Sequence, residues 1–548
     1  MDLFPFEEED FKKVAEELIK CGCCSRCTLR YLGAKDMYTY RGDYNEITCV
    51  IDKFRKHNKL ESNGIDTSES DHKLPAESDA VKEKTLGIEI SNGKNQSQVE
   101  GSSRNTCVVC LGVLGQFADE TFLDQIKKTI DDEGFQYTGY LCSLMLPVCI
   151  ILREHAILQH MKQKFKHLYD DKKDSDVAPI KDVWKWRNGP ILGQKLKAPF
   201  DAKSLFDITL TFDYKESNRE CSFLLSSTNN EAFRKRKKDR RYNKKSADSV
   251  YNRANVGKAI EEMKDEEFMR SYQCPPLPPR CEITCDIKCQ NENIFVAGRY
   301  NKYSRELSQT PWIIEGTRRS ESSVEELLND HIRKFFRHSE QKFSSSGRED
   351  VDVRMLGNGR PFVLELVNPR CRSFTQEQMN KIQESINAAT TDIQCRDLQI
   401  VTKEETDILK QGEIDKVKLY RALCWTNQPI SDQQLDQLSI LKDLKIFQKT
   451  PVRVLHRRPL ATRDKLIHSM EATRVDDLHF NLDLSTQAGT YIKEFVHGDL
   501  GRTRPNLSSI LGTDCDILEL DVMAVELDWP KKIPVESVSL RPDEPTTE

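Results

Sequence analysis

The sequence has no long hydrophobic run. None of its apolar stretches approaches the roughly 18 residues that a membrane-spanning helix requires. The acidic segment 7–10 also stands where a secretory signal peptide would carry basic residues. We therefore expect an intracellular protein without a membrane partner.

An excess of charge of one sign is missing as well. The chain carries 83 Lys and Arg against 88 Asp and Glu, which leaves it close to neutral. Overall charge therefore does not indicate a nucleic-acid partner. A surface that binds phosphates would need its basic residues gathered on one face.

Signatures of nucleotide cofactors are absent too. No P-loop is present, and no GxGxxG turn follows an expected strand and opens an expected helix. The sequence thus predicts no organic cofactor. Its 548 residues are enough for two to four domains with a sizeable core.

Cysteine, in contrast, is plentiful. The 18 cysteines of a chain in a reducing compartment are not expected to form disulfides. Buried cysteines without metal are one interpretation. We predict instead a structural Zn²⁺, because two CxxC pairs supply four thiolates and leave no open coordination position: Cys24, Cys27, Cys107 and Cys110. Cys21 and Cys23 compete with Cys24, which is favoured because it completes the CxxC spacing.

Composition and periodicity divide the N-terminal half of the chain. The spacing of apolar residues predicts a helix over residues 6–20 and a strand over 206–212. Residues 57–105 are polar and almost free of aromatics, so we expect a disordered insertion there. The basic run 234–245 has three interpretations, namely a solvated loop, a nuclear localisation signal or an arm that contacts phosphates.

Residues 344–361 place one carboxylate in an unusual setting. After a loop of serines and glycine, apolar and polar residues alternate over 351–354 as in a half-buried strand. Residues 357–359 (Gly-Asn-Gly) then predict a turn into the apolar run 362–367. The pattern predicts a hairpin with Asp350 at its mouth, facing a cleft. A solvated loop residue or a turn cap is the alternative for this aspartate.

The same stretch carries a resemblance to known enzymes. Gly347-Arg348-Glu349-Asp350 resembles the G-R-x-D signature of pseudouridine synthases. The longer string GREDVDVRMLGNGRPF is similar to that of the Pus-ten family of tRNA pseudouridine synthases, and the similarity runs through nearly the whole chain. The resemblance implies that Asp350 is the catalytic nucleophile.

The resemblance also implies an α+β fold in several parts. They are a zinc-binding accessory region at 1–190, a THUMP-like RNA-binding domain at 190–275 and a pseudouridine synthase catalytic domain at 280–530. The catalytic domain would hold a mixed, mainly antiparallel sheet flanked by helices. A disordered tail at 531–548 would follow.

Further site residues follow from the resemblance. Tyr420, on a strand expected over 418–425, would stack on the target uracil or act as the base if a glycal forms. Lys493 holds the basic position of a GTYIR-like motif, in the first turn of a helix that Thr490 is expected to cap. A cation there opposes the helix dipole unless an anion faces it, and Asp350 is the expected anion. Contacts with the target nucleotide are expected from Arg348, Tyr491, Ile492 and Leu518, with Ile517 as the neighbouring alternative to Leu518.

Two segments combine cations with aromatic residues. Residues 295–312 and 449–465 resemble the family's forefinger and thumb loops. Cations contact phosphates and aromatic faces stack on unpaired bases, although runs of charge are usually solvated. We expect RNA contacts from Arg299, Lys302, Arg305, Arg453, His456, Arg457 and Arg458.

The implied function is isomerisation of uridine to pseudouridine in the TΨC loop of tRNA, at position 54, position 55 or both. The expected enzyme is a monomer of the nucleus and cytoplasm, or of the mitochondrion. A non-catalytic RNA-binding adaptor for stem-loop RNAs such as microRNA precursors is the alternative. The intact Asp350, Tyr420 and Lys493 argue against that role as the sole one, because a pure binder has no need of all three.

Overall fold

The chain folds as two compact units. A computed structural model describes residues 8–41, 106–227, 233, 251–411, 417–456 and 458–534. One unit comprises Met1–Asp132 and Thr138–Cys289, and the other comprises Glu133–Tyr137 and Gln290–Glu548. The expected insertion 57–105, the basic run 234–245 and residues 535–548 of the expected tail lie outside the described residues. Among the described residues, no helix is both long and apolar enough to cross a membrane.

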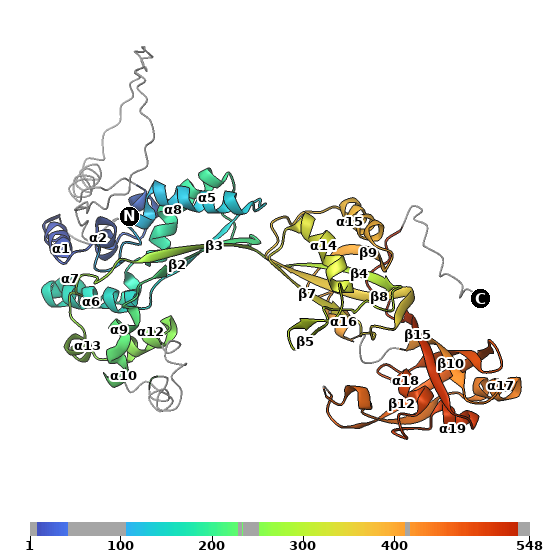
Figure 1. The fold of residues 1–548 in the computed structure, drawn as a ribbon. Coiled ribbons are helices and arrows are strands. Elements are labelled where there is room, and N and C mark those ends of the chain that lie inside the picture. The colour runs from blue at the N-terminus through green and yellow to red at the C-terminus, as the bar shows by residue number, and fades with distance from the viewer. Residues whose placement is uncertain are drawn as a thin grey trace, which may run out of the picture. The chain divides into compact units, whose positions relative to one another are not determined.

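The first unit packs helices around a small sheet (Figure 1). The sheet has the order β1-β2-β3, with β1 (Leu141–Met145) parallel to β2 (Phe206–Asp213) and β3 (Thr284–Asn291) on the far side of β2. β2 buries alternate residues, which confirms the strand predicted at 206–212. Because β3 belongs to this sheet, the expected start of the catalytic domain at 280 precedes the division between the units.

Most of the longer helices of the first unit bury apolar residues. α1 (Glu8–Lys20) confirms the helix predicted near the N-terminus, and its Phe11, Val14 and Leu18 are buried. The others are α2 (Ser25–Tyr31), α3 (Met37–Tyr40), α5 (Glu120–Glu133), α6 (Cys149–Lys164), α7 (Lys166–Tyr169), α8 (Ile180–Leu196), α9 (Ser217–Glu220), α10 (Leu224–Ser227), α12 (Arg253–Glu262) and α13 (Asp265–Ser271).

A ten-stranded sheet forms the frame of the second unit. Its order is β14-β11-β12-β13-β10-β15-β8-β4-β9, with β7 also paired to β8. The β15–β8 pair is parallel and the other pairs are antiparallel, so the predicted mixed, mainly antiparallel sheet is confirmed. The strands are β4 (Ile294–Lys302), β7 (Glu340–Ser345), β8 (Arg354–Val367), β9 (Ile393–Val401), β10 (Lys418–Thr426), β11 (Leu444–Lys449), β12 (Thr462–Arg474), β13 (His479–Thr486), β14 (Thr503–Arg504) and β15 (Cys515–Val525). A small separate ribbon joins β5 (Ile313–Ile314) to β6 (Thr317–Arg318).

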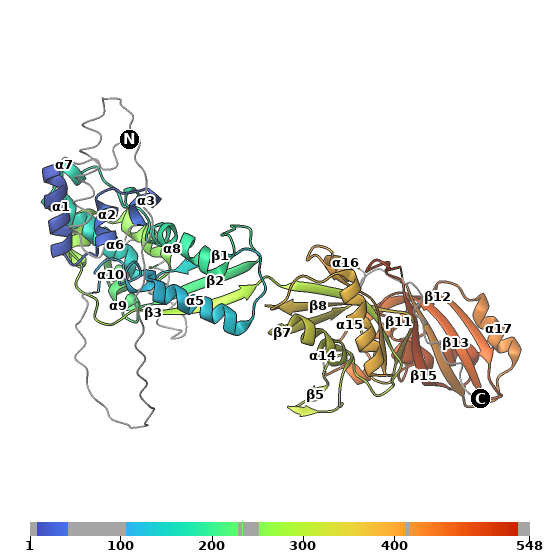
Figure 2. The ribbon, with the colours of Figure 1, turned by 90° about the horizontal axis from the view of Figure 1, so that it is seen from above.

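Helices cover this sheet. α14 (Val324–Phe336) and α15 (Gln376–Ala389) lie beside one another near β7 and β8 (Figure 2). Their buried Leu328, Ile332 and Ile382 share one core with Val296 and Leu364 of the strands. The remaining helices are α16 (Asp407–Gln411), α17 (Asp432–Ile440), α18 (Ile492–His497) and α19 (Leu507–Leu511).

The predicted hairpin at Asp350 was wrong. Residues 351–353 are not a strand, and residues 357–359 lie inside β8. On the neighbouring strand β4, Tyr300 pairs with Arg360 and Lys302 pairs with Met355. Residues 356–359 of β8 therefore stand opposite a single residue of β4 and form a bulge. A Cβ on Gly357 would lie 2.0 Å from the Met523 carbonyl oxygen, so glycine is needed there for a close backbone approach. A bulge and a turn use the same residue types, and the sequence does not separate them.

Prediction: the stability of the second unit falls in mild acid because of His338. This side chain follows α14, is 3 % exposed, and its Nε2 lies 2.8 Å from Asn329 Oδ1. Burial, with the nearby charge of Arg333, lowers the pKa of His338 to about 4. The unfolded chain therefore takes up a proton below pH 6.5 that the folded unit does not, which removes roughly 2 kcal/mol of stability between pH 6.5 and 5.

The measurement is urea unfolding at pH 7 and pH 5. His338→Gln keeps an amide donor toward Asn329 but does not titrate, so this variant should lose less stability than the wild type on acidification. His468→Gln, at an ion pair with the exposed Asp443, is the matched control and should follow the wild type. Equal losses for wild type and His338→Gln would contradict the prediction.

Candidate active site and metal centre

Asp350 lines a cavity of about 410 Å³ in the second unit. Pockets of roughly 300–1,000 Å³ hold small ligands. The walls come from the loop between β7 and β8, from the segment between β11 and β12, from β10, β12 and β15, and from the start of α18 with the residues before it. The lining includes the apolar Val353, Ile492, Leu520 and Val522, the aromatic Tyr420 and Tyr491, and the basic Arg348, Lys418, Arg453, Arg458, Arg463, Lys465 and Lys493.

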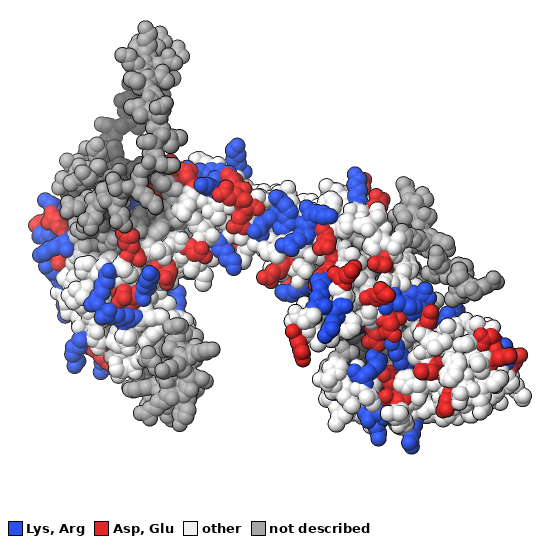
Figure 3. All heavy atoms as spheres, in the orientation of Figure 1, with Lys and Arg blue, Asp and Glu red and all other residues white. Residues whose placement is uncertain are grey.

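Positive charge is concentrated at this cavity. Seven lining residues are basic and two, Glu349 and Asp350, are acidic. On the face drawn in Figure 3, by contrast, Lys and Arg are interspersed with Asp and Glu. The gathered cations that a phosphate-binding surface requires are therefore found at the cavity.

Two cations approach the Asp350 carboxylate. Arg453 Nη1 donates to Asp350 Oδ2 at 2.8 Å, and Lys493 Nζ lies 3.9 Å from the same oxygen. Lys493 donates instead to Asp352 at 2.6 Å. Burial alone would raise the pKa of Asp352, but this hydrogen bond and the Lys493 charge lower it. The structure thus brings Lys493 beside Asp350 as predicted, and adds Arg453 as the nearer partner.

Arg453 is held in turn by a buried acid. Its Nε donates to Glu494 Oε1 at 2.7 Å, and the Glu494 side chain is 2 % exposed. Burial would lower the pKa of Arg453, but the hydrogen bond and charge of Glu494, with the charge of Asp350, raise it. Sequence reasoning missed Glu494, although it shares the first turn of α18 with Lys493 and a second charge there was a visible signal.

A buried network fixes the loop that carries Asp350. Arg360 Nε donates to Glu349 Oε2 at 2.7 Å, and the two side chains are 1 % and 0 % exposed. Tyr300 Oη donates to Glu349 Oε1 at 2.8 Å, and Arg360 Nη1 donates to the Ser346 carbonyl at 2.8 Å. Such a network of mutually satisfied charges restrains its members more strongly than isolated pairs do.

Lys302 and Gly347 tighten the same loop. Lys302 Nζ donates to the carbonyls of Val351 at 2.7 Å and Asp350 at 3.3 Å. Gly347 has φ +88°, a left-handed backbone conformation that favours glycine. The backbone on both sides of the Asp350 carboxylate is therefore held in place.

Tyr420 lies in the cavity wall on β10, whose strand was predicted. Burial raises the pKa of Tyr420 to about 12, with Arg360 opposing and Glu349 adding to the shift. The phenol is therefore protonated at neutral pH. Its ring is half-buried and can present a flat face to a planar ligand.

Three of the four other predicted substrate contacts line the cavity, and Leu518 does not. Arg348, Tyr491 and Ile492 line the cavity. Thr490 does not cap α18: Tyr491 is the N-cap residue, and the Thr490 hydroxyl donates to the Gln487 carbonyl.

The prediction for Leu518 is corrected. This side chain is 55 % exposed and does not line the cavity, whereas Leu520 and Val522 do. Leu423 pairs with Glu519 and Cys424 with Ile517, so Leu518 is the extra residue of a β-bulge and turns outward. The alternative, Ile517, is likewise not among the lining residues.

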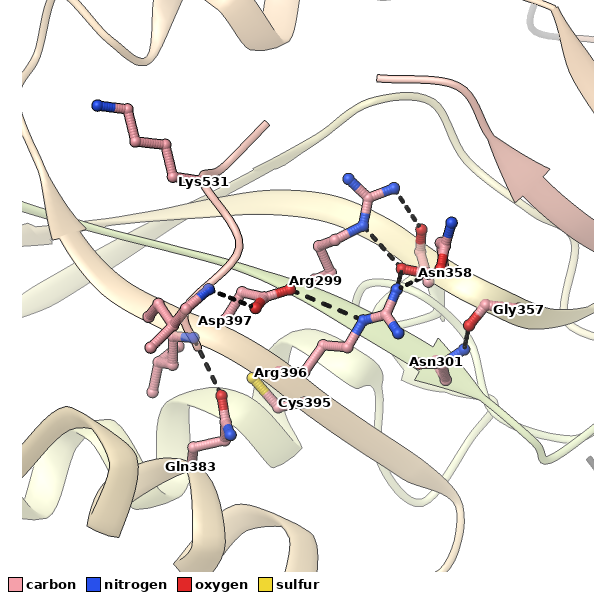
Figure 4. Close-up of polar contacts among 12 residues, drawn as sticks. Arg299, Asn301, Gly357, Asn358, Gln383, Cys395, Arg396, Asp397 and Lys531 are labelled. Carbon is pink, nitrogen blue, oxygen red and sulfur yellow. Dashed lines mark hydrogen bonds and ion pairs between the residues drawn. The ribbon is translucent and has the colours of Figure 1, made fainter. Parts of the chain in front are cut away.

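The prediction that Arg299 and Lys302 contact RNA from a loop was wrong. Residues 294–302 form β4, and the two side chains are 6 % and 0 % exposed. Arg299 Nε donates to the Asn358 carbonyl (Figure 4), and its Nη1 donates to the Leu527 and Trp529 carbonyls. Burial lowers the pKa of Arg299 to about 10. Both cations hold backbone carbonyls inside the fold.

The remaining basic residues differ in exposure. Arg305 forms ion pairs with Glu519 at 2.6 Å and Asp521 at 2.8 Å. His456 and Arg458 are exposed on the segment that also carries Arg453. Arg457 lies outside the described residues.

The four predicted cysteine ligands meet in the first unit. The Sγ atoms of Cys24, Cys27, Cys107 and Cys110 lie within 4.8 Å of one another, and those of Cys24 and Cys110 are 3.8 Å apart. Four sulfurs bound tetrahedrally at about 2.3 Å from Zn²⁺ would lie about 3.8 Å apart, so the spacing fits such an ion. Cys21 groups with Glu17 and His160 instead. The cluster can therefore hold a metal.

Donors surround these sulfurs. The Cys24 amide donates to Cys107 Sγ at 3.3 Å, and Arg30 Nη1 donates to Cys27 Sγ at 3.7 Å. Such donors stabilise thiolates and orient them toward a metal. Because all four ligands come from the chain, a bound ion has no open position and its role is structural.

Comparisons with known proteins point to one family. Residues 295–526 match the family model "Pus10, C-terminal", and residues 107–289 match "Eukaryotic Pus10, N-terminal". The tRNA pseudouridine synthase Pus10 of Homo sapiens is 42 % identical over 535 residues, which cover 96 % of this chain and 99 % of the relative. A putative tRNA pseudouridine synthase Pus10 of Drosophila melanogaster is 35 % identical over 527 residues, covering 95 % and 98 %. A crystal structure of a Cbf5-Nop10-Gar1 complex aligns at 17 % identity over 41 % of this chain and 47 % of that chain, with a TM-score of 0.23 that is too low to bear on function.

Prediction: Cys107→Ser removes the metal. The purified chain should contain about one zinc ion per molecule, and the variant should contain none and unfold at a lower temperature, because metal binding contributes folding free energy. Mass spectrometry and calorimetry measure the two effects. Cys221→Ser, at a buried cysteine outside the cluster, is the control that keeps the metal. Stoichiometric zinc in Cys107→Ser would refute the assignment.

Prediction: Arg453→Met destabilises the second unit through Glu494. The substitution leaves a buried carboxylate without its ion-pair partner, and we expect a loss of about 2 kcal/mol in urea unfolding. Arg453→Met/Glu494→Met should recover most of that loss. Arg458→Met, from the same segment, should cost less than about 0.5 kcal/mol. If the single and double variants are equally unstable, the pair is not coupled.

Proposed function

Because the chain belongs to the Pus10 family of tRNA pseudouridine synthases, a class of isomerases, we propose that it converts uridine to pseudouridine in the TΨC loop of tRNA. The proposed target is position 54, position 55 or both, and the proposed nucleophile is Asp350. One observation carries the proposal: the Asp350 carboxylate opens on a basic cavity whose wall holds Tyr420.

Entry of the target nucleotide requires base flipping. A uridine stacked in the folded arm must leave its stack, which costs a few kcal/mol. The basic residues around the cavity are suited to contact the phosphates of the flipped strand and offset that cost. Arg348 is exposed and adjacent to Glu349 in the same loop, and we assign it to the place that the flipped base vacates.

The Asp350 carboxylate then starts the reaction. Asp350 attacks ribose C1′ while the C1′–N1 bond breaks, or assists loss of uracil as a glycal forms. The detached uracil rotates, and C5 attacks C1′ while the Asp350–C1′ bond breaks, or adds to C1′ of the glycal while C2′ regains the proton it lost. C5 then loses its proton and N1 gains one, so the product is an isomer of the substrate. Arg453 and Lys493 place positive charge beside the carboxylate before the reaction.

Tyr420 and the apolar wall hold the detached base. The protonated Tyr420 can stack on uracil, and the high pKa of this phenol favours a holding role over that of a general base. Ile492, Leu520 and Val522 line the cavity and would exclude water that could intercept the base.

We propose supporting roles for the accessory parts. A structural zinc at the cysteine cluster would tie residues near 24 to residues near 107. A THUMP-like domain at 190–275 remains our proposal for part of the RNA grip. That range contains the end of α8, β2 and the helices α9, α10, α12 and α13.

Prediction: Asp350→Asn binds tRNA but forms no pseudouridine. The amide is nearly isosteric with the carboxylate and is not a nucleophile, so unmodified tRNA should bind within about threefold of wild-type affinity while product disappears. Pseudouridine mapping by mass spectrometry on tRNAs with single uridine replacements also separates positions 54 and 55.

The control for this experiment is Asp443→Asn, at an exposed ion pair far along the chain, which should retain full activity. Pseudouridine from Asp350→Asn would remove this residue from the nucleophile's role. Tight binding without product by the wild type would indicate an RNA-binding adaptor.

A further inference from the structure

The first unit contains a second cavity, of about 690 Å³. It lies between α8, the first residue of α3 with Arg41 after that helix, the start of β1 and the segment that follows α8. Four of its wall residues are aromatic: Tyr140, Trp184, Trp186 and Phe200. None of the residues assigned to the reaction or to the cysteine cluster lines it.

The aromatic walls are fixed by their own contacts. The Tyr140 hydroxyl donates to the Gly189 carbonyl at 3.0 Å, and the Trp184 Nε1 donates to the Phe117 carbonyl at 2.7 Å. The Phe200 ring meets the Tyr140 ring edge-on, with centroids 6.1 Å apart. Phe200 is nonetheless 52 % exposed, so a large apolar face stands at the rim of a preformed cavity.

The charge of the lining has one sign. Arg41, Lys185 and Lys197 line the cavity, and no Asp or Glu is among its described lining residues. Two acids adjacent in sequence to lining residues do not themselves line the cavity: Asp36 accepts from the Thr39 amide, and Asp201 accepts from the Lys203 amide.

Aromatic walls, together with basic lining residues that no acidic lining residue neutralises, suit a nucleotide as ligand. Every nucleobase has a π-face that stacks on aromatic side chains, and each nucleotide brings a phosphate for a cation. A peptide strand would in addition need backbone partners along an open edge. A carboxylate nucleophile is absent from the described lining, so the cavity is suited to binding without chemistry.

We propose that this cavity binds one unpaired nucleobase of the RNA substrate, with its phosphate contacted by Lys185, Lys197 and Arg41. The proposal rests on the proposed function insofar as the substrate is tRNA. It adds a recognition site that is separate from the place where uridine is isomerised. A whole tRNA carries unpaired bases outside the TΨC stem-loop, and we assign the bound base to that part of the tRNA.

The test compares full-length tRNA with an isolated TΨC stem-loop. Phe200→Ala and Lys197→Glu change exposed side chains, so folding should be unaffected, which a thermal melt verifies. Phe200→Ala should raise KM for tRNA about tenfold, since the ring on which the base stacks is lost. Lys197→Glu replaces a proposed phosphate contact with a carboxylate that repels phosphate, and should also raise KM for tRNA about tenfold. Neither should alter kcat, or KM for the stem-loop. Lys128→Glu, the same charge change on the exposed face of α5, is the control that should leave both substrates unaffected.

Binding is measured in parallel with Asp350→Asn as the background, which separates recognition from turnover. Photocrosslinking of 4-thiouridine-substituted tRNA should yield peptides that contain Trp186 or Phe200. Unchanged KM and Kd for tRNA in both cavity variants would overturn the proposal. An equal rise of KM for tRNA and for the stem-loop would also overturn it. If the variants weaken binding of a polyglutamate peptide but not of tRNA, the cavity is a protein-docking site and the proposal is wrong. If the wild type forms no pseudouridine, the proposed function is contradicted. The binding measurements still test the cavity, because they do not depend on turnover.

Discussion

The buried ion pair between Glu349 and Arg360 is the constraint on which the site depends. Both side chains are almost fully buried, and removal of one partner from such a pair typically costs about 3–5 kcal/mol. Glu349 immediately precedes Asp350, so whatever fixes the first residue also fixes the backbone of the second. Tyr300 joins the pair from β4, and Arg360 extends it to the Ser346 carbonyl. The position of the reactive carboxylate is thus set by the interior of the sheet and does not depend on the mobility of a surface loop.

Around Asp350, acidic and basic side chains alternate. Arg453 bridges Asp350 and Glu494, and Lys493 bridges Asp350 and Asp352. Each acid therefore has a cation within ion-pair distance, which leaves little net charge immediately around the nucleophile. The excess of positive charge comes from the other basic residues of the wall.

Sequence patterns predicted features that depend on local periodicity or on spacing. The strands β2 and β10, the helix α1 and the set of four cysteines fall in this class, because alternation and CxxC spacing carry direct geometric meaning. Features that depend on partners distant in the chain were missed. Leu518 alternates correctly with Leu520, yet a bulge against β10 turns it outward. Arg299 has the composition of an RNA-binding loop but lies in a strand, where carbonyls of the C-terminal segment satisfy it. Arg453 was expected to grip RNA, and only the fold shows that Glu494 aims it at Asp350.

The cysteine cluster has a consequence for how this chain can change. Cys24 and Cys107 stand 83 positions apart in sequence and in contact in space. The described part of the segment between the two cysteine pairs includes most of α2 and all of α3, which bury Tyr31 and Tyr40. Sulfur contacts and helix packing therefore hold the same stretch of chain. Substitutions in the core faces of α2 or α3 and substitutions of the cysteines should thus lower the stability of the same part of the first unit.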